Sequence, residues 1–276
     1  MLASLIIVFR EVIEAGLIVG IVLAATRGVA GRGRMVAAGL AAGLAGAVLV
    51  ALFAGRIEAL FAGSGQELLN VTILAAAVGM LAWHNAWMSR HGRAMGEELR
   101  SLGHAVREGR RPLAALGIVI AVAVLREGSE VVLFLYGVAA GGAGAWAMAA
   151  GGAFGIAAGG FVAILMYRGM LSIPTRHIFT ATSTMISLLA AGMAADAAAL
   201  LQQAGFAQFL YTPLWSTAWL LGDGSIPGRM LHTLIGYTAR PDGLQLLAWS
   251  ATLVGFFLLT RAFAVPARRP APASAT

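Results

Sequence analysis

The chain of 276 residues contains no cysteine and no lysine, and only 11% of its residues are charged. Without cysteine it can form no disulfide, no thiolate metal site, no iron–sulfur cluster and no attached c-type haem. A soluble domain typically carries about 25% charged residues. Here 59% of the residues are hydrophobic and the mean hydropathy is +0.84. These scarcities predict an integral membrane protein that contacts a lipid bilayer.

Seven apolar segments are long enough to cross a bilayer, which requires roughly 20 residues in a helix. The segments cover approximately residues 2–25, 35–55, 70–88, 113–140, 145–167, 178–202 and 245–263. We therefore expect an all-α fold of seven transmembrane helices in one domain, residues 1–264. The Pro/Ala-rich tail at 265–276 is typical of a disordered end.

The arginines indicate how these helices are oriented. Most of the 19 arginines fall in the tail or in the loops after the first, third and fifth segments. Only Arg56, Arg229 and Arg240 fall on the other side of the membrane. By the positive-inside rule, the N-terminus is expected outside and the C-terminus inside. The same loops account for the net charge of +7, so no nucleic-acid partner is needed to explain it.

One charged pentad, RExxE, occurs twice within apolar helices, as REVIE at Arg10–Glu14 and REGSE at Arg126–Glu130. Ionisable residues in hydrocarbon are costly, so they generally pair, face a cavity or mark a substrate path. Positions i, i+3 and i+4 share a helix face. Glu11 and Glu14 therefore point together while Arg10 reaches Glu14, and the second pentad repeats this arrangement.

The two halves of the chain also match outside the pentads. Small residues recur at helical spacing in the second and fifth segments, and a Gly-Met step recurs in the third and sixth: Gly39 and Gly43; Gly151, Gly155 and Gly159; Gly79-Met80 and Gly192-Met193. A three-helix unit crosses the membrane an odd number of times, so a second copy must be inverted. We expect two inverted repeats, at about 1–90 and 112–203, and a seventh helix outside them.

If the two pentad helices face each other, four carboxylates can surround one point, with Arg10 and Arg126 toward opposite mouths. The candidate metal ligands are Glu11, Glu14, Glu127 and Glu130. Carboxylate oxygens suit hard cations, and the surplus negative charge can be balanced by a metal ion or by protons. Alternatively each pentad is only an internal salt bridge, although one arginine leaves one glutamate in excess.

Two RExxE pentads in the first and fourth of seven helices resemble the bacterial and fungal iron permeases of the oxidase-dependent iron transporter family. PLWSTAWLL at Pro213–Leu221 and the later Gly236-Tyr237 resemble the family's last outer loop, and LAAGM at Leu189–Met193 resembles its sixth helix. The resemblance implies a permease of the bacterial cytoplasmic membrane that imports iron through the pentad glutamates and holds no permanent cofactor. It also implies a periplasmic oxidase or peroxidase as a partner.

Three further residues are candidate accessory ligands. Asp196, near the outer end of the sixth helix, could receive arriving metal or make a helix-packing hydrogen bond. His84, inside the third helix, fits a metal ligand, a proton relay or a polar group satisfied by a neighbouring helix. Glu67 lies near the position ahead of the third helix where the family usually has an acidic residue. Asp223 and His232 belong to the outer loop, where they could shape that loop or contact metal.

Three functions are compatible with these patterns. The first is an iron permease, and the second is a permease for another di- or trivalent cation such as lead or manganese. The third is a membrane electron carrier or enzyme, which would need cofactor ligands or a nucleophile–base pair. Paired intramembrane histidines for haem are absent, because only His84 lies inside a predicted helix. We therefore expect a transporter and not an enzyme.

Overall fold

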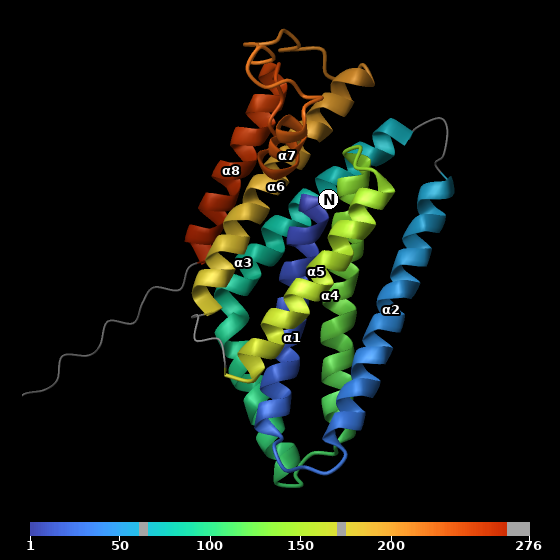
Figure 1. The fold of residues 1–276 in the computed structure, drawn as a ribbon, viewed down its shortest axis with the longest axis vertical. Coiled ribbons are helices and arrows are strands. Elements are labelled where there is room, and N and C mark those ends of the chain that lie inside the picture. The colour runs from blue at the N-terminus through green and yellow to red at the C-terminus, as the bar shows by residue number, and fades with distance from the viewer. Residues whose placement is uncertain (61–65, 170–174, 264–276) are drawn as a thin grey trace, which may run out of the picture.

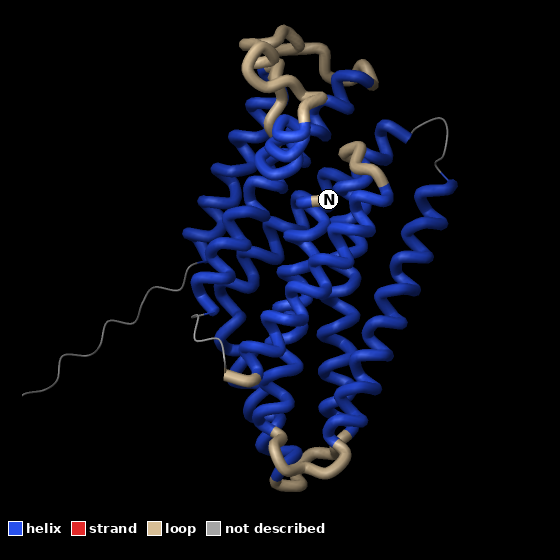
Figure 2. The backbone as a smooth tube through the Cα atoms, viewed as in Figure 1, coloured by secondary structure: helices blue, strands red, loops and turns tan. Residues whose placement is uncertain are grey.

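The computed structural model describes residues 1–60, 66–169 and 175–263. This part of the chain forms eight α-helices and contains no β-strand (Figures 1 and 2). The helices are α1 Leu2–Ala25, α2 Arg32–Leu60, α3 Gln66–Arg107, α4 Ala114–Ala140, α5 Ala145–Tyr167, α6 Thr175–Gln203, α7 Ile226–Ile235 and α8 Gly243–Phe263. The prediction of an all-α protein is confirmed, and each of the seven predicted segments coincides with a helix or lies within one. The predicted disordered tail at 265–276 lies outside the described residues.

Five stretches within these helices are long and apolar enough to cross a membrane. They are Arg32–Ile57, Gln66–Met88, Ala145–Tyr167, Thr180–Gln203 and Gly243–Phe263. The helices α1 and α4 are of similar length, 24 and 27 residues, but each carries three charged side chains near its middle. The bundle therefore has the helices of an integral membrane protein, and α1 and α4 differ from the five apolar stretches by the charges near their middles.

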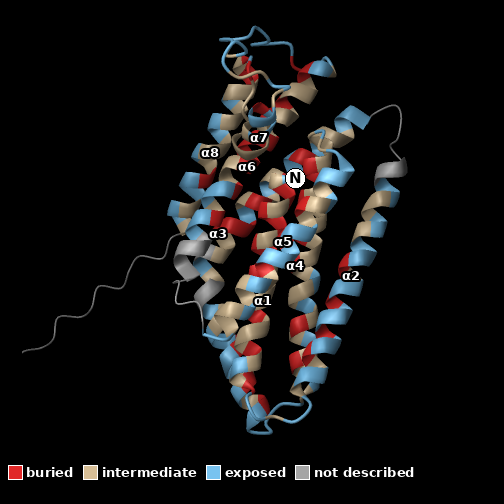
Figure 3. Ribbon diagram, viewed as in Figure 1, coloured by how far each residue is buried: buried red, intermediate tan, exposed pale blue. Residues whose placement is uncertain are grey.

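The helices that carry the pentads lie next to each other, and each packs most extensively on a helix from the other half of the chain. The closest partner of α1 is α5, and that of α4 is α2, while α3 pairs with α6. In Figure 3 the buried residues lie on the facing sides of the helices, and the exposed ones cover the outside of α2 and α8. The pentads thus lie where one pair of packed helices, α1 and α5, meets another, α2 and α4.

Glycines allow α2 to approach α4 closely. A Cβ added to Gly39 would lie 2.5 Å from the carbonyl oxygen of Gly117, and one added to Gly43 would lie 2.7 Å from that of Ala121. Any larger residue would collide with the backbone of α4. The small residues that recur at helical spacing in this segment therefore lie at a close helix crossing.

The contact between α5 and α1 has the same construction. A Cβ on Gly151 would collide with the carbonyl oxygen of Met1, and one on Gly155 would lie 2.8 Å from that of Leu5. Met1 and Leu5 precede the first pentad by nine and five residues, and the residues that α2 meets precede the second pentad by the same intervals. The two crossings therefore share one register relative to the pentads.

The third helix is longer than the sequence analysis predicts. Residues 89–107 were expected to belong to a basic loop, but α3 continues through them to Arg107. The physical reason is an apolar stripe at helical spacing, which packs against α1 and α4: Met95, Leu99, Leu102 and Val106. Gly109, with φ of 75°, and Pro112 then prevent the helix from continuing.

The loop between α6 and α8 contains the short helix α7, which is not among the predicted segments. The Ser225 side chain accepts a hydrogen bond at the start of α7, and Gly236 ends the helix with φ of 71°. A Cβ on Gly192 of α6 would lie 2.9 Å from Cα of Gly236. Trp249 of α8 donates its indole N–H to the carbonyl of Ile235 at 2.7 Å. The end of α7 is thus clamped between α6 and α8.

Candidate metal site

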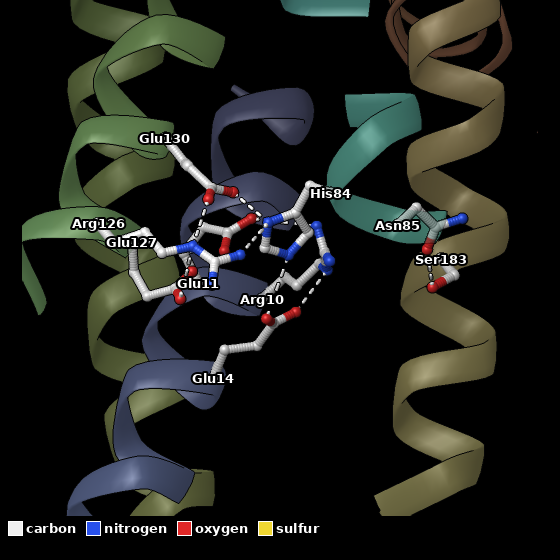
Figure 4. Close-up of polar contacts among 9 residues, drawn as sticks. All are labelled: Arg10, Glu11, Glu14, His84, Asn85, Arg126, Glu127, Glu130 and Ser183. Atoms are coloured by element: carbon white, nitrogen blue, oxygen red, sulfur yellow. Dashed lines mark hydrogen bonds and ion pairs between the residues drawn. The ribbon is translucent and has the colours of Figure 1, made fainter. Parts of the chain in front are cut away.

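The charged side chains of both pentads meet at the centre of the bundle (Figure 4). Glu11 of α1 converges with Glu127 and Glu130 of α4, whereas Glu14 of α1 lies beside His84 of α3. Five of the six are buried, namely Arg10, Glu11, Glu14, Glu127 and Glu130. Arg10 and Glu14 of the first pentad therefore expose almost none of their surface to solvent.

Each arginine is paired with the glutamate one turn later, as the spacing predicts. The Nε atom of Arg10 lies 2.8 Å from Oε1 of Glu14, and the Nε atom of Arg126 lies 3.0 Å from Oε1 of Glu130. Arg10 also donates from Nη1 to Oε1 of Glu11 at 3.2 Å. A buried carboxylate needs such a partner, because an isolated buried charge would cost several kcal/mol, about the amount lost when a buried pair is broken.

His84 of α3 links the two pentads. Its Nε2 atom lies 3.3 Å from Oε2 of Glu14, and its Nδ1 atom makes a close ion pair with Glu130. The same Nδ1 lies 3.4 Å from Nη2 of Arg126. The structure therefore places His84 inside the charged cluster, in contact with both pentads. The sequence indicated this residue only as a lone intramembrane histidine.

Four side chains offer metal-ligand atoms that all lie within 4.8 Å of one another. They come from α1, α3 and α4, and all four are buried: Glu11, His84, Glu127 and Glu130. Among the described residues, no donor reaches Oε2 of Glu11 or Oε2 of Glu127. Three carboxylates and one imidazole form a ligand set suited to first-row transition metals such as iron and manganese. The residues present therefore fit a metal ion.

The geometry differs from the predicted ring of four glutamates. Glu14 lies beside the four-residue set rather than within it, because its two oxygens face Arg10 and His84. Three of the four predicted carboxylates converge, and His84 takes the fourth place.

Arg126 has a second contact that Arg10 lacks. Its guanidinium carbon lies 4.5 Å from the centre of the Trp87 ring, and the ring of His91 stacks on Trp87 with its centre 5.0 Å away. A cation over an aromatic face is held electrostatically. Trp87 thus holds Arg126 in position, a role that no motif in the sequence indicates.

An apolar layer covers the cluster on the side of the loop between α6 and α8. Ile7, Leu81 and Phe134 are fully buried, and each lies about one helical turn beyond the charged residues of its own helix. Residues of α6 and α8 complete the layer: Ile186, Leu189, Ala190, Met193 and Phe256. Within the described part of the chain, these apolar side chains lie between the cluster and that end of the bundle.

Two cavities reach the cluster from the opposite end. One of about 1010 Å³ lies along α1, α3 and α4 and extends to Arg126 and Glu127. The other, of about 1240 Å³, lies among α1, α3, α6 and α8 and extends to Arg10, Glu14 and Glu127. Glu127 borders both cavities. The site is therefore closed on one side and open on the other.

The remaining predicted residues lie away from the cluster. Glu67 is exposed in the first turn of α3, 17 residues before His84, which is about 25 Å along a helix. Asp196 faces His232 of α7, with Oδ1 and Nε2 separated by 3.6 Å. Asp223 accepts a hydrogen bond from a backbone N–H of its own loop at 2.7 Å, so it has a role in loop structure.

Comparisons with known proteins agree with this architecture. Residues 1–268 match the family model of the iron permease FTR1 family. The ferrous iron permeases EfeU of Shigella sonnei and of Escherichia coli O157:H7 are each 28% identical to the chain, across 99% of both sequences. No solved structure matches the chain. Members of the matched family are transporters and not enzymes, and the chain belongs to the iron permease FTR1 family.

Proposed function

We propose that the protein imports iron across the bacterial cytoplasmic membrane and binds it at the central cluster. The observation that carries the proposal is the buried set of three carboxylates and one imidazole, in which two carboxylate oxygens have no donor among the described residues. The proposed ligands are Glu11, His84, Glu127 and Glu130. The relatives' function as ferrous iron permeases supports iron as the substrate.

Glu14 and the two arginines compensate charge in this proposal. Four glutamates and two arginines leave a surplus of negative charge, which a cation neutralises when it binds. Arg10 holds Glu14 and Glu11 while the metal is absent, and Arg126 holds Glu130. Binding requires Glu11 and Glu130 to exchange part of these contacts for the metal.

The closed apolar layer and the two open cavities support an inward-facing conformation. We place the cavities on the cytoplasmic side, since the loops at that end carry most of the arginines. All seven long helices, α1 to α6 and α8, then span the membrane. Import would require the layer at Ile7, Leu81 and Phe134 to open outward while the cavities close.

We also propose that the chain consists of two inverted repeats of three helices. The reciprocal pairing of α1 with α5 and of α4 with α2 supports this, as does the identical register of both glycine contacts relative to the pentads. Inverted repeats with a shared site at the midplane are a common transporter architecture, in which one repeat moves against the other.

An external oxidase or peroxidase belongs to the proposal as a partner that prepares the metal. Uptake by reconstituted protein separates the two oxidation states, because ⁵⁵Fe²⁺ held reduced by ascorbate and ⁵⁵Fe³⁺ chelated by citrate can be supplied in turn. Uptake of ferric iron only would support an oxidising partner. Equal uptake of ferrous iron without any partner would contradict that part of the proposal.

Radiolabelled iron uptake into proteoliposomes tests the function itself. Glu11→Gln, Glu127→Gln and Glu130→Gln keep side-chain size but remove the anionic ligand, so each should lower initial uptake at least tenfold. Glu14→Gln should lower it as well, because that change frees Arg10 beside the ligands. The control is Glu67→Gln, which alters an exposed carboxylate far from the cluster. Full accumulation in all four central variants would refute the proposal.

A further inference from the structure

A second pair of metal-ligand side chains faces each other on the outer side of the apolar layer. Nδ1 of His232 lies 2.9 Å from the carbonyl oxygen of Tyr237. A carbonyl only accepts hydrogen bonds, so Nδ1 carries the proton and donates it. In the neutral ring the lone pair then belongs to Nε2, which lies 3.6 Å from Oδ1 of Asp196. Two ligand atoms thus point at each other.

The pair is held in place by four separate elements. Asp196 lies one turn beyond Gly192, whose contact with Gly236 clamps the end of α7 onto α6. The indole of Trp249 in α8 secures the same end of α7. Behind Asp196, a Cβ on Gly141 would lie 3.1 Å from Oδ2, so the α4–α5 turn closes on the carboxylate. Such fixed side chains suit a binding site more than a mobile loop contact.

We propose that Asp196 and His232 form an outer binding site for a divalent transition-metal ion, separate from the central cluster. Bonds of about 2.1 Å from a nitrogen and an oxygen to one metal place those atoms roughly 3.0–3.4 Å apart. The observed 3.6 Å is close to that separation. The backbone hydrogen bond at Nδ1 is the support that a metal-ligating histidine ordinarily has.

The surroundings also favour a hydrated cation. Asp196 is 25% exposed and His232 is 36% exposed, so water can complete the coordination shell. His232 lies in the last turn of α7, where the partial negative charge of the helix end attracts cations. An imidazole and a carboxylate together select iron, manganese or zinc over calcium or magnesium.

The position suggests what the outer site does. Asp196 lies one turn outward of Met193, a member of the apolar layer, and the central cluster lies on the other side of that layer. The outer site therefore holds a metal ion directly before the closed layer. This role rests on the proposed function, whereas the binding itself does not.

Metal binding can be measured without transport in purified full-length protein reconstituted in nanodiscs. The central cluster is first disabled by Glu11→Gln together with Glu127→Gln. Mn²⁺ serves as the probe, because pulsed electron paramagnetic resonance detects a directly bonded ¹⁴N nucleus. We expect one Mn²⁺ per chain to remain in this background, with one nitrogen coupling. The absence of bound Mn²⁺ would overturn the inference.

Two variants of the pair distinguish a metal site from a structural ion pair. His232→Asn keeps an N–H donor near the position of Nδ1, so it preserves the bond to Tyr237, but it removes Nε2. Asp196→Asn removes the charged ligand at constant size. Each should abolish Mn²⁺ binding in the disabled background and leave the melting temperature within a few degrees. His104→Asn, in a cavity on the opposite side, is the matched control and should change neither.

Uptake then tests the role separately. With the central cluster intact, His232→Asn should raise the KM for iron about tenfold and leave the maximal rate nearly unchanged, since the ion is captured less well but still crosses. An unchanged KM would overturn the role while a retained nitrogen coupling would still support the site. Loss of uptake in the central variants tests the proposed function and does not depend on His232.

Discussion

Arg10 and Arg126 hold the same position in the two pentads, but their surroundings differ. The Arg10 side chain is 2% exposed and enclosed by two carboxylates, whereas Arg126 is 35% exposed and lies on the ring of Trp87. A repeated sequence motif has therefore produced an asymmetric site. The asymmetry matches a bundle that is open on one side only.

The two arginines should differ in their contribution to stability. Arg10→Gln leaves Glu11 and Glu14 buried without a cation beside them except His84, so the free energy of unfolding should fall by about 3–5 kcal/mol. Arg126→Gln should cost about 1 kcal/mol or less, because solvent screens this arginine and Glu130 keeps His84. Unfolding followed by tryptophan fluorescence in detergent measures both values. Equal losses would contradict the asymmetry.

Replacing His84 should weaken metal binding more than it weakens folding. His84→Ala removes the imidazole ligand and the bridge between the pentads, so the affinity for Fe²⁺ should fall at least tenfold. Anaerobic calorimetry on purified protein measures the affinity. His91→Ala is the control, because His91 stacks on Trp87 and is not among the four side chains whose ligand atoms converge. An unchanged affinity in His84→Ala would exclude the imidazole from the ligand set.

The glycine contacts should be sensitive to a single methyl group. Gly155→Ala places a Cβ against the α1 backbone, so it should lower stability by about 1–3 kcal/mol. Gly43→Ala should have a similar effect at the equivalent crossing. Gly160→Ala, on the same helix as Gly155, meets no atom within 4 Å and should be neutral. Melting temperatures in detergent compare the three, and a neutral Gly155→Ala would contradict the packing.

The lack of native cysteine allows accessibility to be mapped with one introduced thiol at a time. Thr184→Cys, in the larger cavity, should react with a membrane-impermeant maleimide supplied from the cytoplasmic side only. Leu81→Cys, in the apolar layer, should not react from either side, and Gln208→Cys in the outer loop should react from outside. Labelling in oriented membrane vesicles measures this. Reaction of Thr184→Cys from the outside would reverse the proposed orientation.

Metal competition should reflect the mixed ligand set. A tenfold excess of Mn²⁺ should reduce ⁵⁵Fe²⁺ uptake by at least half, because imidazole and carboxylate ligands bind both ions. The same excess of Ca²⁺ or Mg²⁺ should have little effect, since those ions prefer oxygen ligands alone. Stronger inhibition by Pb²⁺ or Mn²⁺ than by unlabelled iron would favour the alternative substrates.

The contacts set by local spacing were predictable, and those set by helix rotation were not. Arg10 pairs with Glu14 because four residues make one helical turn, which holds in any helix. His84 reaches the cluster only because of how α3 is rotated in the bundle, and that rotation is fixed by packing against α1, α4 and α6. The sequence therefore identified His84 as unusual without placing it among the ligands.

The same distinction explains the extension of α3 and the outer pair. The basic residues after position 88 indicated a loop, but the apolar stripe that includes Leu99 finds a partner surface only once α1 and α4 are in place. Asp196 and His232 are separated by 36 residues, and the contact between them depends on the clamp at Gly192. Contacts over such distances leave no periodic pattern in a single sequence.

The pairing of α1 with α5 has a consequence for synthesis of the chain. The first helix leaves the ribosome with three charged residues, and its main partner begins about 120 residues later. At roughly 5–20 residues per second, that interval is on the order of ten seconds. The charged residues of α1 face α3 and α4, and α4 begins only 89 residues after α1 ends, so they lack their α4 partners for most of this time. We therefore expect the first helix to be held beside a polar surface during insertion until its partners are made.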